Sequence, residues 1–123
     1  MTATAPAEWF TGTVFIDPFG AAPDDAPFAA TRVTFTPGAR TAWHTHPHGQ
    51  TIHVVSGVCL VGREGGAVER LTTGESAWFA PGENHWHGAA PDALMAHVAV
   101  HGKDADGNAA TWGPHVSDAE YGA

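Results

Sequence analysis

Residues 38–57 read GARTAWHTHPHGQTIHVVSG, and this stretch decides the fold. It follows a Pro37-Gly38 turn and alternates polar residues with β-branched and aromatic ones. Such alternation is typical of short β-strands bounded by turns, and it lacks a helical period. The stretch therefore predicts two strands, Thr41–Thr45 and Thr51–Ser56, separated by the turn Pro47-His48-Gly49.

The same pattern continues on both sides of this stretch. Short runs rich in Val, Thr, Phe and Trp alternate with turn clusters, for which the chain has fifteen Gly and nine Pro. Nothing reads as a helix that could connect parallel strands, so we expect an all-β antiparallel sandwich or barrel. The other expected strands are Phe10–Ile16, Arg32–Phe35, Val58–Arg63, Ala67–Leu71, Ser76–Phe79, His85–Gly88 and Leu94–Val100.

The chain divides into three parts around a single barrel. Residues 1–30 hold an N-terminal strand and a Pro-rich connection, residues 31–101 the barrel, and residues 102–123 a C-terminal tail. The Pro-rich connection leaves the first strand free to pair elsewhere, with a second subunit as one option. In the tail, Ser117-Asp-Ala-Glu120 fits a capping box and predicts a short turn of helix.

Composition and charge exclude several classes of partner. Five Lys and Arg against thirteen Asp and Glu give a net charge of −8, which disfavours nucleic acid and anionic membranes. No apolar run approaches the roughly 20 residues of a membrane helix, and the N-terminus does not read as a signal peptide. The single cysteine, Cys59, cannot form an intramolecular disulfide. We expect a cytoplasmic protein that binds a small molecule.

Nine histidines are many for 123 residues, and two of them share one strand face. His44 and His46 project to the same side, about 6–7 Å apart along the strand, which suits two ligands of one ion. The alternative is a pair of polar residues that merely face the barrel. His53 has the opposite parity to Gln50 and is expected to face outward.

Two spaced motifs surround these histidines. In the first, five residues separate Gly38 from His44-Thr-His46, three separate His46 from Gln50, and six separate Gln50 from Gly57. The second runs from Gly74 through Pro81-Gly82 to His85. Together they resemble the paired motifs of the cupin superfamily, small β-barrels that hold a metal between two strand-turn segments. Departures from the family pattern are Gln50 in place of Glu, Pro81 one place late, and Ala89 in place of Asn.

The resemblance implies a single cupin barrel with an extra N-terminal strand and a short C-terminal helical turn. It also implies one divalent metal bound by His44, His46, Gln50 and His85. A mixed nitrogen and oxygen shell suits manganese(II) or iron(II), with nickel(II) and zinc(II) as further alternatives, and the resemblance to manganese cupins described below favours manganese(II). Because Gln50 is neutral where Glu would be charged, the ion keeps more of its Lewis acidity. That favours lyase or isomerase chemistry over oxygen chemistry.

Three further histidines are expected to face the same cavity. His87 lies two residues after His85, and His97 and His101 share a face of one strand. A neutral imidazole is suited to move a proton to or from a hydroxyl. Each of the three, taken singly, could equally be a structural histidine whose ring nitrogens are hydrogen-bonded.

The segments RTAWHTHP (40–47) and WFAPGENHWHGAAP (78–91) are similar to the small bacterial manganese cupins with hydroxynitrile lyase activity. The similarity implies cleavage of a cyanohydrin to an aldehyde and hydrogen cyanide, catalysed by His87 and His97. His101 stands where that group can carry Gln, and we assign it to the catalytic set as well. The residues expected to line the substrate pocket are Thr31, Val33, Ala42 and Met95.

Two other functions stay open, and a homodimer is expected. One is a cupin dioxygenase acting on a small aromatic or diketone, and the other is a non-catalytic cupin that binds a small molecule.

Arg40 could steer an anion or form a surface salt bridge. Cys59 is expected to be a small buried hydrophobe, and Trp43 and Trp86 to face away from the metal.

Overall fold

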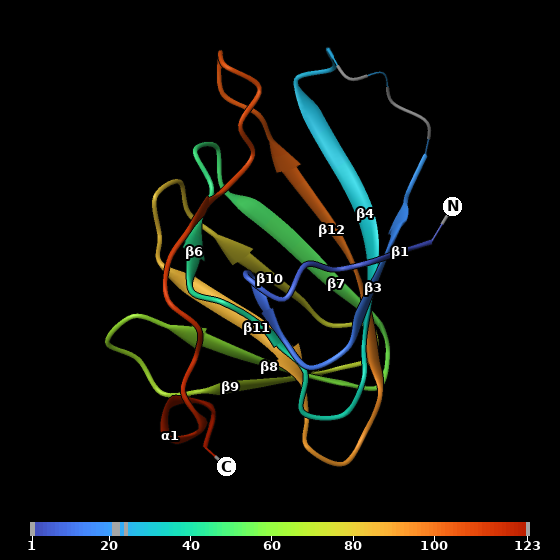
Figure 1. Ribbon diagram of the computed structural model, residues 1–123, viewed down its shortest axis with the longest axis vertical. Coiled ribbons are helices and arrows are strands. Elements are labelled where there is room, and N and C mark those ends of the chain that lie inside the picture. Colours follow the sequence, from blue (N-terminus) through green and yellow to red (C-terminus); the bar gives the residue numbers. More distant parts are fainter. Residues whose placement is uncertain (1, 21–22, 24, 123) are drawn as a thin grey trace.

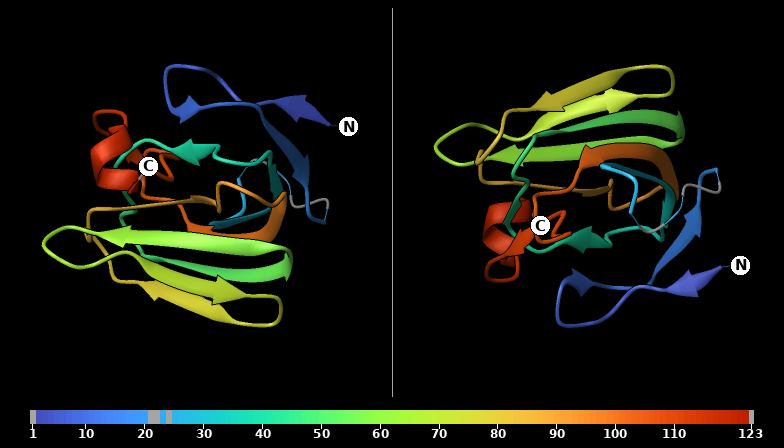
Figure 2. Two further views of the ribbon diagram at one scale, coloured as in Figure 1. Left: turned by 90° about the horizontal axis from the view of Figure 1, so that it is seen from below. Right: turned by 90° about the horizontal axis from the view of Figure 1, so that it is seen from above.

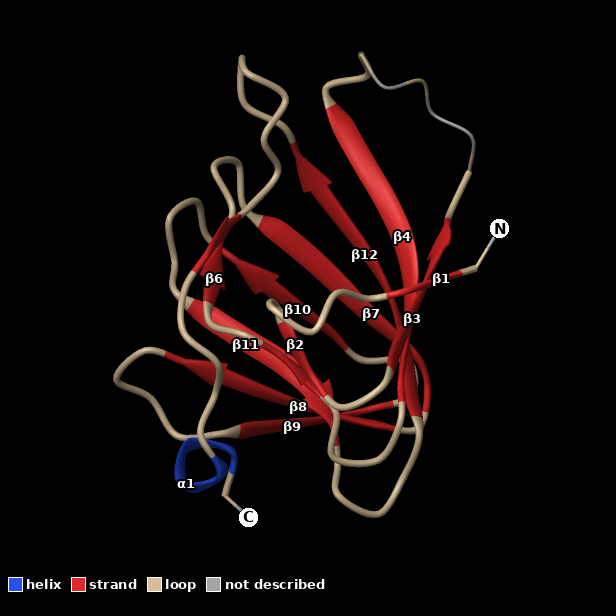
Figure 3. Ribbon diagram, in the orientation of Figure 1, coloured by secondary structure: helices blue, strands red, loops and turns tan. Residues whose placement is uncertain are grey.

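Two antiparallel sheets curl against each other to form the body of the protein (Figure 1). The computed structural model describes residues 2–20, 23 and 25–122. Within these residues every strand pair is antiparallel, and strands and loops account for nearly the whole chain (Figure 3). The all-β prediction is therefore confirmed.

The strands of each sheet follow in spatial order. The first sheet contains β1 (Ala3–Thr4), β3 (Val14–Pro18), β4 (Phe28–Phe35), β12 (Met95–Gly102), β7 (Gln50–Ser56) and β10 (Ser76–Phe79). The second contains β13 (Thr111–Trp112), β6 (His44–Thr45), β11 (His85–Ala89), β5 (Arg40–Thr41) and β2 (Phe10–Thr11), with β8 (Val58–Arg63) on β11 and β9 (Glu69–Thr72) on β8. Figure 2 shows the N-terminal strands and the helix α1 (Asp118–Tyr121) at the periphery of the molecule.

The alternation of the sequence becomes a division between a core face and a solvent face. Along β7, Gln50, Ile52 and Val54 are buried, whereas Thr51 and His53 are exposed. Inward residues of both sheets form one apolar core that includes Phe35 and Phe79. This core fills one part of the barrel, while the polar inward residues gather in the rest.

The strand expected at Phe10–Ile16 is in fact two strands in different sheets. Gly12 has φ +79°, and a Cβ added there would lie 2.9 Å from the Cβ of Ala39. This left-handed position turns the chain, so that β2 joins β5 and β3 joins β4. The expectation that the first strand pairs elsewhere is wrong, because β3 completes the sheet of its own chain.

The strand expected at Thr41–Thr45 is also interrupted. The backbone N–H of Ala42 donates to the Trp9 carbonyl at 2.7 Å, and that of Trp43 donates to the Pro114 carbonyl at 2.9 Å. These bonds to the two terminal segments take the place of ladder bonds, leaving the short strands β5 and β6.

The predicted capping box is present at the start of α1. The Ser117 hydroxyl accepts from the Glu120 N–H, and the Glu120 carboxylate accepts from the Ser117 N–H. The helix packs Tyr121 with Trp86 and Val116 in a second, smaller core. No helix among the described residues is long and apolar enough to cross a membrane.

Candidate metal centre

A cavity of about 370 Å³ lies between the two sheets, at the end of the core where polar residues point inward. Its walls are mostly apolar and aromatic. The polar side chains that line it include His44, His46, Gln50, His87, His97 and His101. Five imidazoles around one cavity are a concentration of neutral nitrogen donors, which is the composition of a transition-metal site.

The strand register brings the two sequence motifs together. His44 opens β6 and His85 opens β11, and these two residues are direct partners across the antiparallel pair. Their rings lie 4.3 Å apart between centroids, and the His46 ring is 4.9 Å from that of His44. Gln50, the first residue of β7, places its Oε1 at 3.3 Å from the His85 Nε2. All four predicted ligands therefore meet in one place.

Backbone carbonyls fix the tautomer of three of these imidazoles. The Nδ1–H groups donate to the carbonyl of Ala42 from His44 at 2.9 Å, to that of Ala109 from His46 at 2.6 Å, and to that of Glu83 from His85 at 2.9 Å. A carbonyl oxygen only accepts, so each Nδ1 carries the proton and each neutral ring keeps its lone pair on Nε2. This is how protein histidines are prepared to bind a metal through Nε2.

The Nε2 atom of His85 faces another acceptor, and the Nε2 atom of His46 faces no hydrogen-bond partner among the described residues. The His85 Nε2 faces the Gln50 Oε1, so two lone-pair atoms stand 3.3 Å apart with no proton between them. The His46 Nε2 is buried without a hydrogen-bond partner among the described residues. A cation bound between these atoms satisfies both arrangements, and the residues present therefore fit a divalent metal.

A third buried histidine lies close to His44 and His85. His44, His85 and His87 each offer a ring nitrogen, and these three atoms lie within 4.8 Å of one another. Three buried histidines so placed can hold a divalent metal. His87, for which the resemblance implies proton transfer, thus borders two of the predicted ligands directly.

His87 and His97 form a pair at the inner end of the cavity. The His87 Nδ1 lies 2.9 Å from the His97 Nε2, and both side chains are buried. The outward nitrogens of the pair, His87 Nε2 and His97 Nδ1, have no hydrogen-bond partner among the described residues. The edge of the Phe35 ring packs near both imidazoles.

Burial keeps these histidines uncharged at neutral pH. Loss of hydration lowers the pKa of His85, His97 and His101 to about 4 in each case. Burial, and after it the charge of His85, holds the pKa of His44 well below its usual range. The pKa of His87 is lowered in the same way, with His97 as the second cause. Neutral imidazole is the form that binds a cation or accepts a proton.

His101 lies at the edge of the ligand group. Its ring stacks on that of His46 at 4.9 Å between centroids, and its Nδ1 accepts from the Gln50 Nε2 at 3.3 Å. This bond orients the Gln50 amide, because the nitrogen turned toward His101 leaves Oε1 facing His85.

Of the four residues expected in the substrate pocket, two line the cavity and two do not. Thr31 and Val33, on β4, line the cavity. Ala42 and Met95 are completely buried but do not line it. Ala42 sits at the break between β5 and β6, and Met95 packs into the apolar core beside Phe35.

Part of the wall comes from residues that the sequence does not flag. Trp9, Phe10 and Trp112 line the cavity, and the Trp9 and Trp112 rings stack at 5.2 Å. Aromatic residues in both terminal segments were the available signal. The carbonyl of Ala109 left none, since any residue could supply it.

The remaining candidates lie away from the cavity. Arg40 forms the expected salt bridge, with the exposed Asp118 carboxylate at 2.9 Å, but its own side chain is buried outside the cavity lining and also donates to the backbone carbonyl of Val116. Burial raises the pKa of the Cys59 thiol to about 12, in keeping with a small core residue. Trp86 packs in the second core and His53 is exposed on β7.

Comparison with known proteins agrees with this geometry. The sequence profile described as Cupin domain matches residues 31–101. An (R)-mandelonitrile lyase from Granulicella tundricola is 57% identical over 94% of this chain and 88% of its own length. A cupin-like protein from Thermotoga maritima superposes with a TM-score of 0.89 at 31% identity, over 97% of this chain and 90% of the other. A cupin-2 domain protein from Rhodospirillum rubrum shares the fold at 12% identity, with a TM-score of 0.75 over 98% of this chain and 78% of the other. The chain belongs to the cupin family.

Proposed function

We propose that this protein is a metal-dependent hydroxynitrile lyase that cleaves cyanohydrins to an aldehyde and hydrogen cyanide. The observation that carries the proposal is the set of three imidazoles locked by backbone carbonyls with Nε2 free, beside the buried His87–His97 pair. The similarity to the (R)-mandelonitrile lyase supports the same reaction.

The ligands of the proposed site are His44, His46, His85 and Gln50, and manganese(II) is the proposed metal. Three nitrogens and one amide oxygen, all uncharged, leave positions open for substrate and suit a six-coordinate first-row ion. When bound, the ion supplies a Lewis acid that stabilises negative charge developing on the substrate oxygen.

The chain's own residues handle the proton. In the proposed reaction the neutral His87–His97 pair accepts the hydroxyl proton of the cyanohydrin. The electrons of that O–H bond form the carbonyl, the bond between the carbinol carbon and the nitrile carbon breaks, and cyanide leaves with its electron pair. The protonated pair then returns its proton to cyanide. One cyanohydrin thus yields one aldehyde and one hydrogen cyanide, with the pair regenerated.

The cavity walls favour an apolar, aryl-bearing substrate. Phe10, Phe35 and Trp112 present ring faces and edges, and Val33 adds an aliphatic surface. A space of about 370 Å³ is at the small end of typical ligand pockets. His101 holds Gln50 in place, and we assign it to positioning a ligand rather than to accepting the proton.

Turnover of racemic mandelonitrile tests the reaction. Metal-stripped protein is reloaded with manganese(II), and benzaldehyde formation is followed by absorbance, with enantiomer ratios measured by chiral chromatography. We expect turnover that requires the metal. Dioxygen consumption with diketone substrates, in the absence of mandelonitrile cleavage, would instead support an oxygenase. A metal-loaded protein without either activity would support the binding role.

His44→Ala tests the ligand set, with His53→Ala as its matched control. Both residues are strand histidines, but His44 is buried in the site and His53 is exposed and bonded to Ser76. We expect manganese content and turnover to be lost in the first variant and kept in the second. Full manganese content in His44→Ala would contradict the assignment.

We propose in addition that the protein is a cytoplasmic homodimer. An apolar row crosses the outer face of the first sheet, where Trp78 and Val100 flank Thr51 in register and Phe28 lies further along β4. These three apolar side chains are about half exposed. A buried single thiol, Cys59, suits a reducing compartment. Light scattering of the protein and of Val100→Glu tests the dimer, which the charge should weaken.

A further inference from the structure

We propose that the C-terminal segment, residues 109–121, contributes to metal binding at the metal centre, and that Arg40 is the positioning residue that holds this segment in place. The inference rests on the metal site proposed above. The segment lies outside the two cupin motifs, and the inference makes it a contributor to metal affinity rather than a mere extension of the barrel.

One end of this segment touches two of the proposed ligands. The Ala109 carbonyl accepts the Nδ1–H of His46 at 2.6 Å, the shortest of the three bonds that fix the ligand tautomers. The Trp112 ring lies 4.6 Å from the His44 ring between centroids. Trp112 and Ala109 also line the cavity. Displacing the segment would therefore free His46 to rotate and open one wall.

The middle of the segment is bonded to the strand that carries His44. Within β13, Trp112 is the direct partner of His44 in β6. The Gly113 N–H donates to the Trp43 carbonyl at 2.7 Å, and the Trp43 N–H donates to the Pro114 carbonyl at 2.9 Å. The ladder itself is short, because β13 has only two residues and sits at the edge of its sheet, although the Trp112 ring packs on Trp9 and Phe10. Such a short edge strand needs anchoring from elsewhere.

Arg40 provides this anchor at the far end of the segment. Its Nε and Nη2 donate to the Val116 carbonyl at 3.2 and 2.9 Å, and Nη2 also meets the Asp118 carboxylate at 2.9 Å. The guanidinium carbon lies 4.5 Å from the centre of the Tyr121 ring. The Arg40 side chain is 7% exposed, so the bonds to Val116 are sheltered from water even though Asp118 is exposed.

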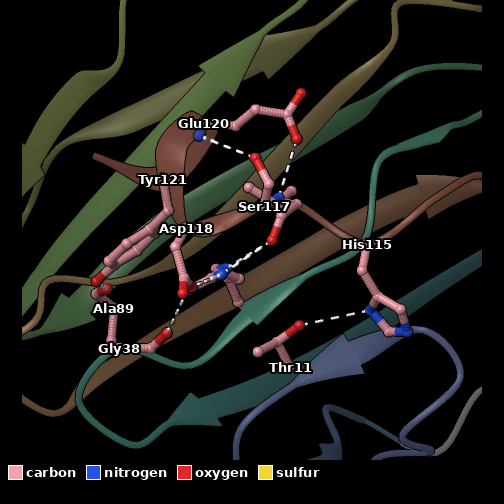
Figure 4. Close-up of polar contacts among 10 residues, drawn as sticks. Thr11, Gly38, Ala89, His115, Ser117, Asp118, Glu120 and Tyr121 are labelled. Atoms are coloured by element: carbon pink, nitrogen blue, oxygen red, sulfur yellow. Dashed lines mark hydrogen bonds and ion pairs between the residues drawn. The ribbon is translucent and has the colours of Figure 1, made fainter. Parts of the chain in front are cut away.

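The helix α1 is also bonded to the barrel. Figure 4 shows Ser117, Asp118 and Tyr121 together, with Tyr121 reaching Ala89. The Arg40 guanidinium donates to the Asp118 carboxylate and to the Gly38 carbonyl. The Tyr121 hydroxyl donates to the Ala89 carbonyl at 2.5 Å. Ala89 ends β11, whose first residue is His85. The Tyr121 bond thus links the segment to β11, the strand that carries the proposed ligand His85.

Metal affinity and docking of the segment must then be coupled in both directions. If the docked segment tightens metal binding by some factor, bound metal stabilises the docked segment by the same factor. Outer partners of metal-ligating histidines change metal affinity by about 10–100-fold when they are removed. Because Arg40 acts on Ala109 through the segment, we expect an effect at the lower end of this range.

Manganese(II) titration of Arg40→Met tests the inference, with free manganese followed by electron paramagnetic resonance. Met keeps the apolar stem over Tyr121 and removes the donors to Val116. We expect the manganese Kd to rise about tenfold. Arg40→Lys retains a charged donor and should restore part of the affinity, whereas the control Arg70→Met, exposed on β9, should match wild type.

Amide exchange of residues 111–113 supplies the second readout. Exchange should rise in Arg40→Met without metal, and manganese should slow it in the wild type by about the factor seen in the Kd. Tyr121→Phe, which loses only the bond to Ala89, should change both readouts in the same direction by less. Faster exchange with an unchanged Kd, or unchanged exchange in Arg40→Met, overturns the inference. A wild type that binds no manganese overturns the proposed function itself, so the two failures are distinguishable.

Discussion

His87 and His97 share one proton across a gap of 2.9 Å between Nδ1 and Nε2. When the His87 Nδ1 carries it, the His87 Nε2 has a free lone pair, and when the His97 Nε2 carries it, the free lone pair is on the His97 Nδ1. A proton accepted at one outer nitrogen can therefore be passed through the shared bond. In the proposed reaction the pair can therefore move a proton between two buried side chains.

His97→Gln should abolish this relay while leaving the metal in place. Gln preserves size and hydrogen bonding but has no basic nitrogen, so we expect kcat for mandelonitrile cleavage to fall by about 10²–10⁴-fold. Steady-state kinetics and metal analysis of the same samples measure the two effects. The exposed His53→Gln serves as the control. Loss of manganese from His97→Gln would mean that His97 supports the metal site rather than the proton.

The stability of the metal-free protein should decline as the pH falls. The pKa of His97 is lowered by burial from 6.5 to about 4, so between these values the unfolded chain binds a proton that the folded protein does not. The stabilisation is present above pH 6.5 and is lost toward pH 4, with a slope of about 1.4 kcal/mol per pH unit for one such group. Urea unfolding across this range should give a slope in His97→Gln that is shallower by about one proton. Equal slopes in the two proteins would show that His97 is already charged in the fold.

Structural features that depend on residues close together in the chain are predicted well from the sequence. Strand alternation puts His44 and His46 on one face, and the capping residues Ser117 and Glu120 lie within one helical turn of each other. Gly57, which ends the first motif, is required partly by its own backbone conformation and partly by a distant segment. Its φ of +77°, and the Leu94 carbonyl 1.9 Å from where a Cβ would stand, leave room only for glycine.

The rest of the site depends on contacts between distant segments. The Ala109 carbonyl orients His46 from 63 residues away, and a backbone oxygen has no residue signature. Arg40 shares strand parity with His44, yet it packs against the tail, because the break at Ala42 separates β5 from β6. Parity arguments hold within one unbroken strand, and the expectations that Arg40 faces the site and that Ala42 lines the pocket both cross such a break.

Cys59 should be inert in the folded protein. Its pKa is raised by burial to about 12, and its side chain is fully buried in the apolar core. We expect a thiol reagent to modify Cys59 only at the rate of unfolding, and Cys59→Ala to keep wild-type turnover while lowering the free energy of unfolding by about 1 kcal/mol. Rapid modification of the native protein, with loss of activity, would contradict this assignment.

Gln50→Glu tests whether the neutral donor set favours lyase chemistry. A carboxylate at Oε1 would face the His85 Nε2 with a full negative charge, which should tighten manganese binding and weaken the ion's attraction for electrons of the substrate. It would also remove the N–H that Gln50 donates to His101. We expect a lower manganese Kd together with a kcat reduced about tenfold or more at full metal loading. Gln50→Ala, which loses the ligand without adding charge, should instead raise the Kd. If Gln50→Glu bound manganese more tightly and turned over mandelonitrile as fast as wild type, the charge of the donor set would have no part in the rate.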